Sequence, residues 1–432
     1  MSDCDGDDGR PGRAAGLAGV SMGQDRSRRT TVDRRTVIRG ALGLAAAGGV
    51  LGLSACGGDD GSDTVPTPTA TTGSVASPTT TPAIVSTPLA AYQDPERWRG
   101  RTLTVASPGG AYQAAQETAF ILPFQEATGA RITVEVVDVG RITQQVDRGE
   151  TVWDLCCIPT ENVIQLGRDG YLTPIDYAVV DSTALFEDMR MAIAMQHGVI
   201  VDLYSTTIAY AAAASEVPES WTDFWDVSRF GGLRTLRRSP VGTLEFALLA
   251  DGVAVEDLYP LDADRAFAAL ERIYPSVITW YEDAQLPVQY VLGGQVGLSS
   301  AWNVRIDAAD VEGQVRAQWN GGMLSGDSWV VPMGARNADL AMDFINYSTR
   351  SVPQANFCNI LPFGPVNARA LEFIAPDRIG RCPTSDALRP VQFLENWNYW
   401  TDEREGLTER FEAFLTQGRP DATPIATPVP LQ

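Results

Sequence analysis

The sequence predicts an α/β protein in which two β/α lobes are joined by a two-strand hinge. The segment between the polar ends is about 325 residues long, which exceeds what one hydrophobic core usually holds, so two lobes are expected. Its first part alternates β-rich and helix-like stretches, which is the pattern of a parallel sheet. Two later β-type stretches, residues 198–211 and 326–332, are suited to strands that cross from one lobe to the other.

The first lobe begins with a predicted strand over residues 101–106, whose side chains alternate in polarity. A Ser-Pro-Gly-Gly turn leads into a helix-like run over 111–129. Predicted strands over 130–139 and 151–159 follow, and the second of these is apolar on both faces, as a central parallel strand is. The order β-α-β-α-β results.

The second lobe follows the crossing stretch at 198–211. A helix over 218–230 is predicted to end before Gly231-Gly232, and a strand over 233–238 comes next. The remaining predicted elements are helices over 243–252 and 262–277 and a helix followed by a strand within 287–302.

Because residues 326–332 cross back, we expect 93–205 and 328–375 to form the first lobe and 206–327 and 376–418 the second. Ligands of open α/β sheets bind beyond the carboxyl ends of the strands, so residues directly after strands are the site candidates.

The two ends of the chain resemble targeting and linker segments. Residues 1–55 resemble a twin-arginine signal joined to a lipoprotein box, with Arg34-Arg35 before a short apolar run and a small-residue cleavage site. The resemblance implies export by the Tat route and a lipid anchor on Cys56, which would hold the protein on the extracytoplasmic face of the membrane. Residues 56–92, rich in Pro and Thr, are predicted to be a disordered tether, and 419–432 a disordered tail.

Composition excludes several classes of function. The net charge is -21, which argues against a nucleic-acid partner and suits a cationic one. The chain has no lysine, so Schiff-base catalysis, phosphate-loop NTPase activity and Ser-Lys hydrolysis are excluded. His197 is the single histidine and lies near no nucleophile motif, so we interpret it as structural. We expect no cofactor, no metal site and no catalytic residues.

Four cysteines lie within the part expected to fold. Cys156 and Cys157 are adjacent and would face opposite sides of a strand. Cys358 and Cys382 flank a loop and can form a disulfide in an oxidising compartment. These spacings do not match a metal knuckle.

Asp327 is the most informative single residue, because it interrupts the apolar run MLSGDSWVVP. A carboxylate in a buried strand costs several kcal/mol unless a counter-charge compensates, and we expect that counter-charge to come from a bound ligand. An N-cap or turn aspartate is the alternative. Ser325, in the same run, and Tyr112, after the first predicted strand, are further contact candidates; Tyr112 can equally pack at the hinge.

Several segments resemble the solute-binding lipoproteins of ATP-driven importers, specifically the spermidine/putrescine-binding family. They include GGAYQAAQETAFILPFQEATG, WDLCCIPTENVIQLGRDGYLTPID, ESWTDFWDVSRFGGLRTLRR, SSAWNVRI and GDSWVVPMGARNADLAMDFINY, in order across residues 100–400. The resemblance implies a periplasmic-binding-protein-like fold of type II, capture of a polyamine-like cation, and delivery to an ABC permease in the membrane by a monomeric protein.

The same resemblance implies site residues. Asp327 aligns with a ligand aspartate of the family, and Trp302 and Asn303 align with its tryptophan shelf, although a core Trp is the alternative. Thr160, Glu161 and Asn162 occupy a loop where the family contributes contacts. Glu161 can also simply begin the next helix, where an acid complements the helix dipole.

One stretch departs from the family pattern. Where the family places acids in the second lobe, this chain has Ser239 and Thr243, preceded by Arg237 and Arg238. Arginines that face inward would repel a second ammonium group. A zwitterion or carboxylate-bearing amine, such as an amino acid, would instead suit Asp327 at one end and Arg238 or Arg305 at the other.

A carboxylate-only secreted hydrolase is the more remote alternative. It would need two acids about 5–9.5 Å apart in one cleft, and Asp327 is the one convincing candidate in the sequence. An adhesive surface module would instead expose an apolar patch.

Overall fold

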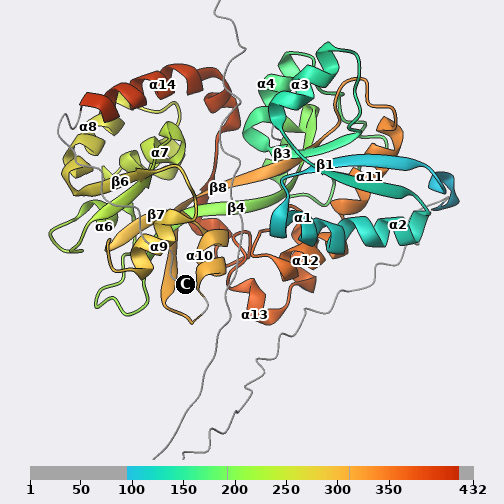
Figure 1. The fold of residues 1–432 in the computed structure, drawn as a ribbon. Coiled ribbons are helices and arrows are strands. Elements are labelled where there is room, and N and C mark those ends of the chain that lie inside the picture. The colour runs from blue at the N-terminus through green and yellow to red at the C-terminus, as the bar shows by residue number, and fades with distance from the viewer. Residues whose placement is uncertain (1–94, 192, 311, 418–432) are drawn as a thin grey trace, which may run out of the picture. The chain divides into compact units, whose positions relative to one another are not determined.

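The computed structural model describes residues 95–417 except 192 and 311, and all of these belong to one compact unit (Figure 1). The predicted signal, the tether, the tail and the lipidation site at Cys56 lie outside the described residues. Within the described part, no helix combines the length and apolar character needed to cross a membrane.

Nine strands form one sheet in the order β2-β1-β3-β8-β4-β7-β5-β6, and β9 pairs with β8. The strands are β1 (Thr102–Ser107), β2 (Arg131–Val136), β3 (Leu155–Pro159), β4 (Gly198–Ala211), β5 (Arg234–Arg237), β6 (Val277–Tyr281), β7 (Leu298–Trp302), β8 (Val315–Val330) and β9 (Gln392–Leu394).

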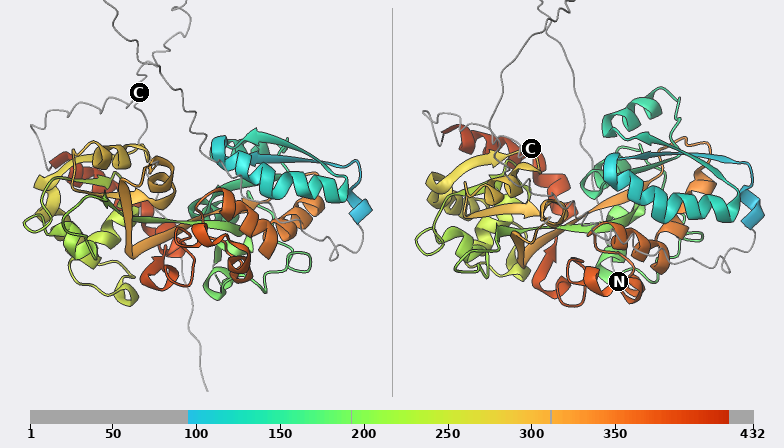
Figure 2. Two further views of the ribbon diagram at one scale, coloured as in Figure 1. Left: turned by 90° about the horizontal axis from the view of Figure 1, so that it is seen from below. Right: turned by 60° about the horizontal axis from the view of Figure 1, so that its bottom comes forward.

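Helices flank the sheet along both halves (Figure 2). The α-helices are α1 (Gly110–Gln116), α2 (Leu122–Thr128), α3 (Val139–Asp147), α4 (Val163–Arg168), α5 (Glu187–Met191), α6 (Trp221–Trp225), α7 (Pro240–Ala250), α8 (Ala263–Ile273), α9 (Leu286–Leu292), α10 (Asn303–Ala309), α11 (Ala338–Ser348), α12 (Ser351–Ile360), α13 (Pro376–Ile379) and α14 (Trp397–Gln417). A π-helical turn, η2 (Glu117–Ile121), joins α1 to α2, and a 3-10 turn, η3 (Thr160–Asn162), joins β3 to α4.

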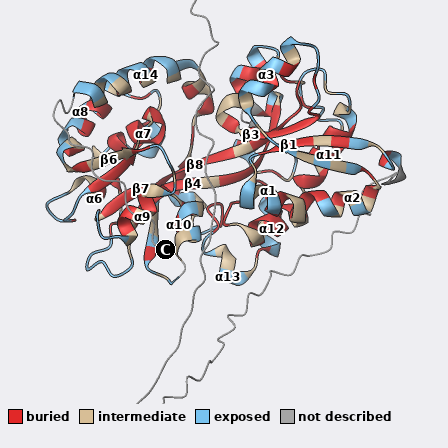
Figure 3. Cartoon of the chain, in the orientation of Figure 1, coloured by how far each residue is buried: buried red, intermediate tan, exposed pale blue. Residues whose placement is uncertain are grey.

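The first lobe is built on a parallel β2-β1-β3 arrangement, as the sequence predicts. Leu103 and Val105 of β1 and Leu155 of β3 are buried in its core. Buried residues follow the strands, while the outward faces of the helices are exposed (Figure 3). The α/β character of the fold is therefore confirmed.

The second lobe has β5 between β6 and β7, and all three strands are parallel. Its core includes Leu236 of β5, Leu244 and Phe246 of α7, and Phe411 of α14. Because the three strands are parallel, their last residues meet at one edge of the sheet. These residues are Arg237, Tyr281 and Trp302.

The two lobes are joined by β4 and β8, which pair antiparallel along most of their length and run from one group of elements into the other (Figure 1). Ile200 and Trp329, at one end of the pair, lie in the first core, whereas Ile208 and Met323, at the other end, lie in the second. The predicted crossing strand at 198–211 matches β4. The second crossing strand begins earlier than predicted, at Val315.

Gly326 allows β4 and β8 to approach each other closely. A Cβ atom at this position would collide with the Asp202 carbonyl oxygen and would lie 2.9 Å from Leu203 Cδ2. The register of the strand pair shifts between Ile200 and Asp202, which places a β-bulge beside this glycine.

Two predicted elements differ from the structure. The helix expected over 218–230 ends at Trp225, because the Asp226 side chain accepts hydrogen bonds from the backbone N–H groups of Ser228 and Arg229 and forms a turn. Residues 277–281 form the strand β6, which starts at the last residue of an expected helix. The polarity pattern did not reveal this strand.

One lobe boundary also differs. Ile379 and Cys382 pack on the first core, although 376 onward was assigned to the second lobe. The chain returns to the second core only later, where Phe393, Trp400 and Phe411 are buried.

A carboxylate-rich candidate site on the crossing strands

Four polar side chains share one face of the crossing strands. Asp202 lies opposite Asp327, and Tyr204 lies opposite Ser325. Side chains two residues apart on a strand project from the same face, so Asp202 and Tyr204 of β4 and Ser325 and Asp327 of β8 form one patch. Asp327 stands within β8, not after a strand as expected, and Asp202 is a second carboxylate that the sequence analysis missed. The signal was the same: an acid inside the apolar run GVIVDLY.

Tyr112 joins this patch from α1. Its hydroxyl donates a short hydrogen bond to Asp202 Oδ2 and lies 3.3 Å from Cys157 Sγ. The same hydroxyl also stabilises the Asp327 carboxylate. Phe357 and Phe363 pack edge-on against the Tyr112 ring and fix its position. The structure therefore brings two predicted site residues, Tyr112 and Asp327, together.

Within the described residues, the two aspartates lack a cationic partner. No arginine within the described residues forms an ion pair with Asp202 or Asp327, and Asp202 Oδ1 is buried without a hydrogen-bond donor there. Burial, reinforced by the charge of Glu161, raises the pKa of Asp327 to about 7. Burial and the neighbouring Asp327 raise the pKa of Asp202 well above its usual value.

A third buried acid, Glu395, follows β9 and was also missed by the sequence analysis. Its Oε2 accepts a 2.7 Å hydrogen bond from Ser325 Oγ. Burial, followed by the charge of Glu161, raises the pKa of Glu395 to about 8. Arg404 of α14 lies 3.0 Å from Glu161 and 3.9 Å from Glu395, so this arginine is shared between both acids.

Two aromatic rings continue the patch toward the second lobe. Trp302, at the end of β7, pairs with Thr206 of β4 and packs 5.2 Å from the Tyr204 ring. Both rings are partly exposed. Such faces suit the methylene body of a small amine.

Arg237, at the end of β5, provides a cation at the far end of this array. Its guanidinium carbon lies 5.3 Å from the Trp302 ring centre. The Arg237 guanidinium forms no hydrogen bond or ion pair with another described residue. Burial raises the pKa of Tyr204 well above its usual value, the charge of Asp327 raises it further, and the charge of Arg237 lowers it. One phenol therefore lies within range of both charges.

The arginines expected to supply this cation lie elsewhere. Arg238 is exposed and binds Glu412 at 2.6 Å and Glu282 at 3.4 Å. Arg305 is exposed on α10. Successive residues along an extended chain project to opposite faces, so the side chains of Arg237 and Arg238 point to opposite sides.

Several other predicted site residues are engaged by the protein itself. Thr160 exchanges a 2.8 Å hydrogen bond with Ser328, and Asn162 donates to the Pro159 carbonyl. Asn303 accepts from the Ser205 N–H and donates to the Pro362 carbonyl, so its amide secures the crossing strands.

Ser239 and Thr243 serve the start of α7. Ser239 Oγ accepts the N–H of Val241 as the N-cap, and Thr243 Oγ1 donates to the Arg237 carbonyl. Ser239 and Thr243 do not join the patch, although Thr243 supports the backbone of Arg237.

The four described cysteines are free and buried. The predicted disulfide between Cys358 and Cys382 is not formed in the structure, although the Cys358 thiol is influenced by the charge of Cys382. No cluster of metal-ligating side chains occurs within residues 95–417 as described.

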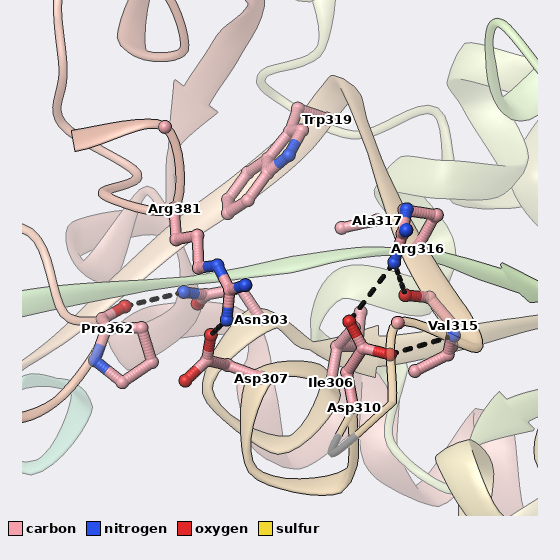
Figure 4. Close-up of a pocket in the computed structure, with 12 residues that line it drawn as sticks. Asn303, Ile306, Asp307, Asp310, Val315, Arg316, Ala317, Trp319, Pro362 and Arg381 are labelled. Carbon is pink, nitrogen blue, oxygen red and sulfur yellow. Dashed lines mark hydrogen bonds and ion pairs between the residues drawn. The ribbon is translucent and has the colours of Figure 1, made fainter. Parts of the chain in front are cut away.

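A separate pocket of about 360 Å³ lies against α10 and the first part of β8 (Figure 4). Asp307 is paired there with Arg381, and Asp310 binds Arg316 at 3.1 Å. Because both acids are already neutralised, this pocket is a poorer candidate for capturing a charged solute than the patch on the crossing strands.

Comparisons with known proteins identify the family. Residues 119–379 match the model of the bacterial extracellular solute-binding protein family. The chain is 33% identical over 328 residues to a gamma-aminobutyric acid-binding protein of Pseudomonas aeruginosa, which covers 74% of this chain and 92% of the relative.

Solved structures agree. An ABC transporter substrate-binding protein from Bradyrhizobium japonicum is 34% identical with a TM-score of 0.68, covering 73% of this chain and 100% of the other. A protein described as a GABA receptor is 30% identical with a TM-score of 0.67, covering 75% and 99%. The expected periplasmic-binding-protein-like fold is confirmed.

The resemblance to polyamine binders is more distant. The spermidine/putrescine-binding periplasmic protein of Escherichia coli is 24% identical over 161 residues, or 37% of this chain and 45% of the relative. The chain belongs to the bacterial extracellular solute-binding protein family: it is the extracytoplasmic solute-binding component of an ABC importer and not an enzyme.

Proposed function

We propose that this protein captures a small ω-amino acid, of the size and charge of γ-aminobutyrate, for transfer to its permease. The single observation that carries the proposal is the placement of Arg237, which stands over Trp302 without an acidic partner in the described chain. The buried acids Asp202 and Asp327 lie along the same sheet face. A negative end and a positive end separated by aromatic rings match a zwitterion with an apolar middle.

Each part of such a ligand has a counterpart. Its ammonium group would bind Asp327, and its carboxylate would bind the guanidinium of Arg237 through charge-assisted hydrogen bonds. The methylene chain would lie against Tyr204 and Trp302. The relative named as a gamma-aminobutyric acid-binding protein supports this choice of ligand class.

A polyamine suits the patch less well. Its second ammonium group would approach Arg237, and two cations near each other with no acid between them repel. Ser239 and Thr243, which stand where acids were expected, are committed to α7 and offer no charge.

Isothermal titration calorimetry with γ-aminobutyrate, putrescine and butyrate tests the proposal. We expect measurable binding of γ-aminobutyrate only, since putrescine lacks the carboxylate and butyrate lacks the ammonium group. Arg237→Gln should weaken γ-aminobutyrate binding about 10- to 100-fold, the value of one lost charged hydrogen-bond pair.

Arg238→Gln is the matched control, because it removes the same charge from the neighbouring residue on the opposite face. We expect it to leave the dissociation constant within about twofold. Equal losses for both variants, or tighter binding of putrescine than of γ-aminobutyrate, would refute the proposal.

We further propose that the protein reaches its site of action by the twin-arginine route and is acylated at Cys56. Both features rest on the sequence of residues 1–56, which lie outside the described part. Cys56→Ala should release the protein from membranes into the soluble extracytoplasmic fraction, and Arg34→Lys with Arg35→Lys should retain it inside the cell. Membrane attachment of the Cys56→Ala variant would contradict the anchor.

A further inference from the structure

We propose that Asp202 and Asp327 act as one proton-sharing carboxylate pair, and that capture of an ammonium group expels the shared proton. Asp202 thereby becomes a positioning residue that sets the pH range of binding through Asp327. This inference rests on the proposed function for the identity of the amine, but the pair itself is a property of the ligand-free protein.

The geometry brings two like charges together. Asp202 and Asp327 are directly opposed on paired strands, on the same face, with Asp202 fully buried. Two carboxylates in such a position cannot both ionise without a counter-charge, so the ligand-free pair holds a proton.

Within the described residues, the groups that face the pair are acids, hydroxyls and thiols, and none of them is a basic side chain. Facing the pair are Tyr112 from α1, Cys157 from β3, Glu161 from η3, Tyr204 from β4 and Cys358 from α12. No arginine within the described residues pairs with either aspartate, and the chain has no lysine. Arg237 lies beyond Tyr204 at the far end of the patch, and Arg404 is paired with Glu161, so within the described residues a proton is the positive charge left to neutralise the pair itself.

Tyr112 arranges the pair. Its hydroxyl donates to Asp202 Oδ2, and Tyr112 lowers the pKa of both Asp202 and Asp327 against the larger effect of burial. Asp202 has no exposed surface, whereas Asp327 is partly exposed. Asp327 is thus the group that meets the ligand, and Asp202 lies behind it.

The exchange is balanced. The ligand arrives as R–NH₃⁺, the singly charged pair loses its shared proton to water, and the complex contains an ammonium group beside two ionised carboxylates. A primary amine remains protonated well above neutral pH, so the ligand does not supply the released proton.

The direction of the pH dependence follows. Burial raises the pKa of Asp327 to about 7 in the free protein, and a bound ammonium group lowers it again. Affinity is therefore full above pH 7 and is lost as the pH falls through that value, by about tenfold per pH unit once the pair is protonated.

Calorimetry of γ-aminobutyrate binding, at pH 6 in phosphate and in Bis-Tris and at pH 8 in phosphate and in Tris, measures the protons released. We expect close to one proton per ligand at pH 6 and close to none at pH 8. Identical enthalpies in both buffers at pH 6, with a dissociation constant that does not change between pH 5.5 and 8, would overturn the proposal.

Asp202→Asn tests the role of the second carboxylate. Asparagine has the same shape but carries no charge, so the affinity transition should move to lower pH; an unmoved transition would show that Asp202 does not share the proton. Should Asp202→Asn fail to fold, Tyr112→Phe gives the second test. It removes a donor that stabilises the ionised pair, so the transition should move to higher pH, and no movement would count against the arrangement.

Arg237→Gln separates the two proposals. It should weaken binding while leaving the proton release at pH 6 unchanged, because it touches only the carboxylate end. If no zwitterion binds at all, the proposed function is wrong. NMR titration of the carboxyl groups in the ligand-free protein then tests whether Asp202 and Asp327 share a proton. An apparent pKa near 7 that falls in the Asp202→Asn variant supports the pair, and two ordinary aspartate titrations near pH 4 refute it.

Discussion

Asp327 occupies a position where function and stability oppose each other. It is largely enclosed beside a second, fully buried acid, with no arginine of the described chain to neutralise it. Its pKa in the folded protein is about 7, against a usual value of 3.8 in an unfolded chain. Between these pH values the unfolded chain has lost a proton that the folded protein keeps, so the stability contributed by this residue falls as pH rises from about 4 to 7.

Asp327→Asn should therefore stabilise the ligand-free protein at pH 8, by about 2–4 kcal/mol at most, and change it little at pH 4. The same variant should lose γ-aminobutyrate binding. Thermal unfolding at both pH values, compared with Glu282→Gln as an exposed control, measures the effect. A destabilised variant at pH 8 would show that the carboxylate is already compensated within the protein.

Individual residues were predictable where an ionisable group interrupts an apolar run. Asp327 was found this way, and Asp202 carries the same signal but was overlooked. Glu395 could not be found, because its place in the patch follows from tertiary contacts such as the hydrogen bond from Ser325, 70 residues earlier. The choice between Arg237 and Arg238 was also out of reach, since it depends on the face of a four-residue strand.

At the scale of elements, the two crossing strands determine where the site forms. β4 and β8 each leave one core and enter the other, and the face they share holds the acids midway. Their length was predictable for β4, whose β-type pattern runs unbroken over 14 residues. It was underestimated for β8, because its first half is half-exposed and polar.

Gly326→Ala should test how closely these strands must approach. Its Cβ would meet the Asp202 backbone, so we expect a loss of about 2–4 kcal/mol in unfolding free energy and a weaker site. Gly380→Ala is the control, because its Cβ has no neighbour within 4 Å and its φ is -70°. Unfolding in urea distinguishes them; equal stabilities would mean that the strands can separate freely.

At the scale of the whole molecule, α14 contacts the first lobe through Trp397, which is buried in the first core, and through two ion pairs. Arg404 binds Glu161 of η3, and Arg168 of α4 binds Asp402. These side chains are substantially exposed, and exposed ion pairs contribute about 0–1 kcal/mol each.

A double-mutant cycle with Glu161→Gln and Arg404→Gln should therefore give a coupling below about 1 kcal/mol that falls further in 1 M salt. The ion pairs would then add little to what the crossing strands and the burial of Trp397 contribute. A salt-insensitive coupling of several kcal/mol would contradict this, because it would require a desolvated pair.

The two-lobe arrangement and the ligand class depend on different features of the sequence. The number of residues and the alternation of strands and helices predicted the lobes. The ligand class depends on which charges meet across the lobes, and that is determined by pairings between distant residues. The departure at Arg237 and Arg238 indicated a zwitterion, and the placement of Arg237 beside Trp302 supports it.

The central claim is that opposite charges at the two ends of the patch select a zwitterion. The most direct measurement is the ratio of dissociation constants for putrescine and γ-aminobutyrate, in the natural protein and in Arg237→Glu. We predict that the natural protein prefers γ-aminobutyrate by at least about 100-fold and that Arg237→Glu reverses the preference, because an acid then faces the second end of the ligand. A natural protein that binds putrescine as tightly as γ-aminobutyrate, with a ratio unaffected by Arg237→Glu, would contradict the account.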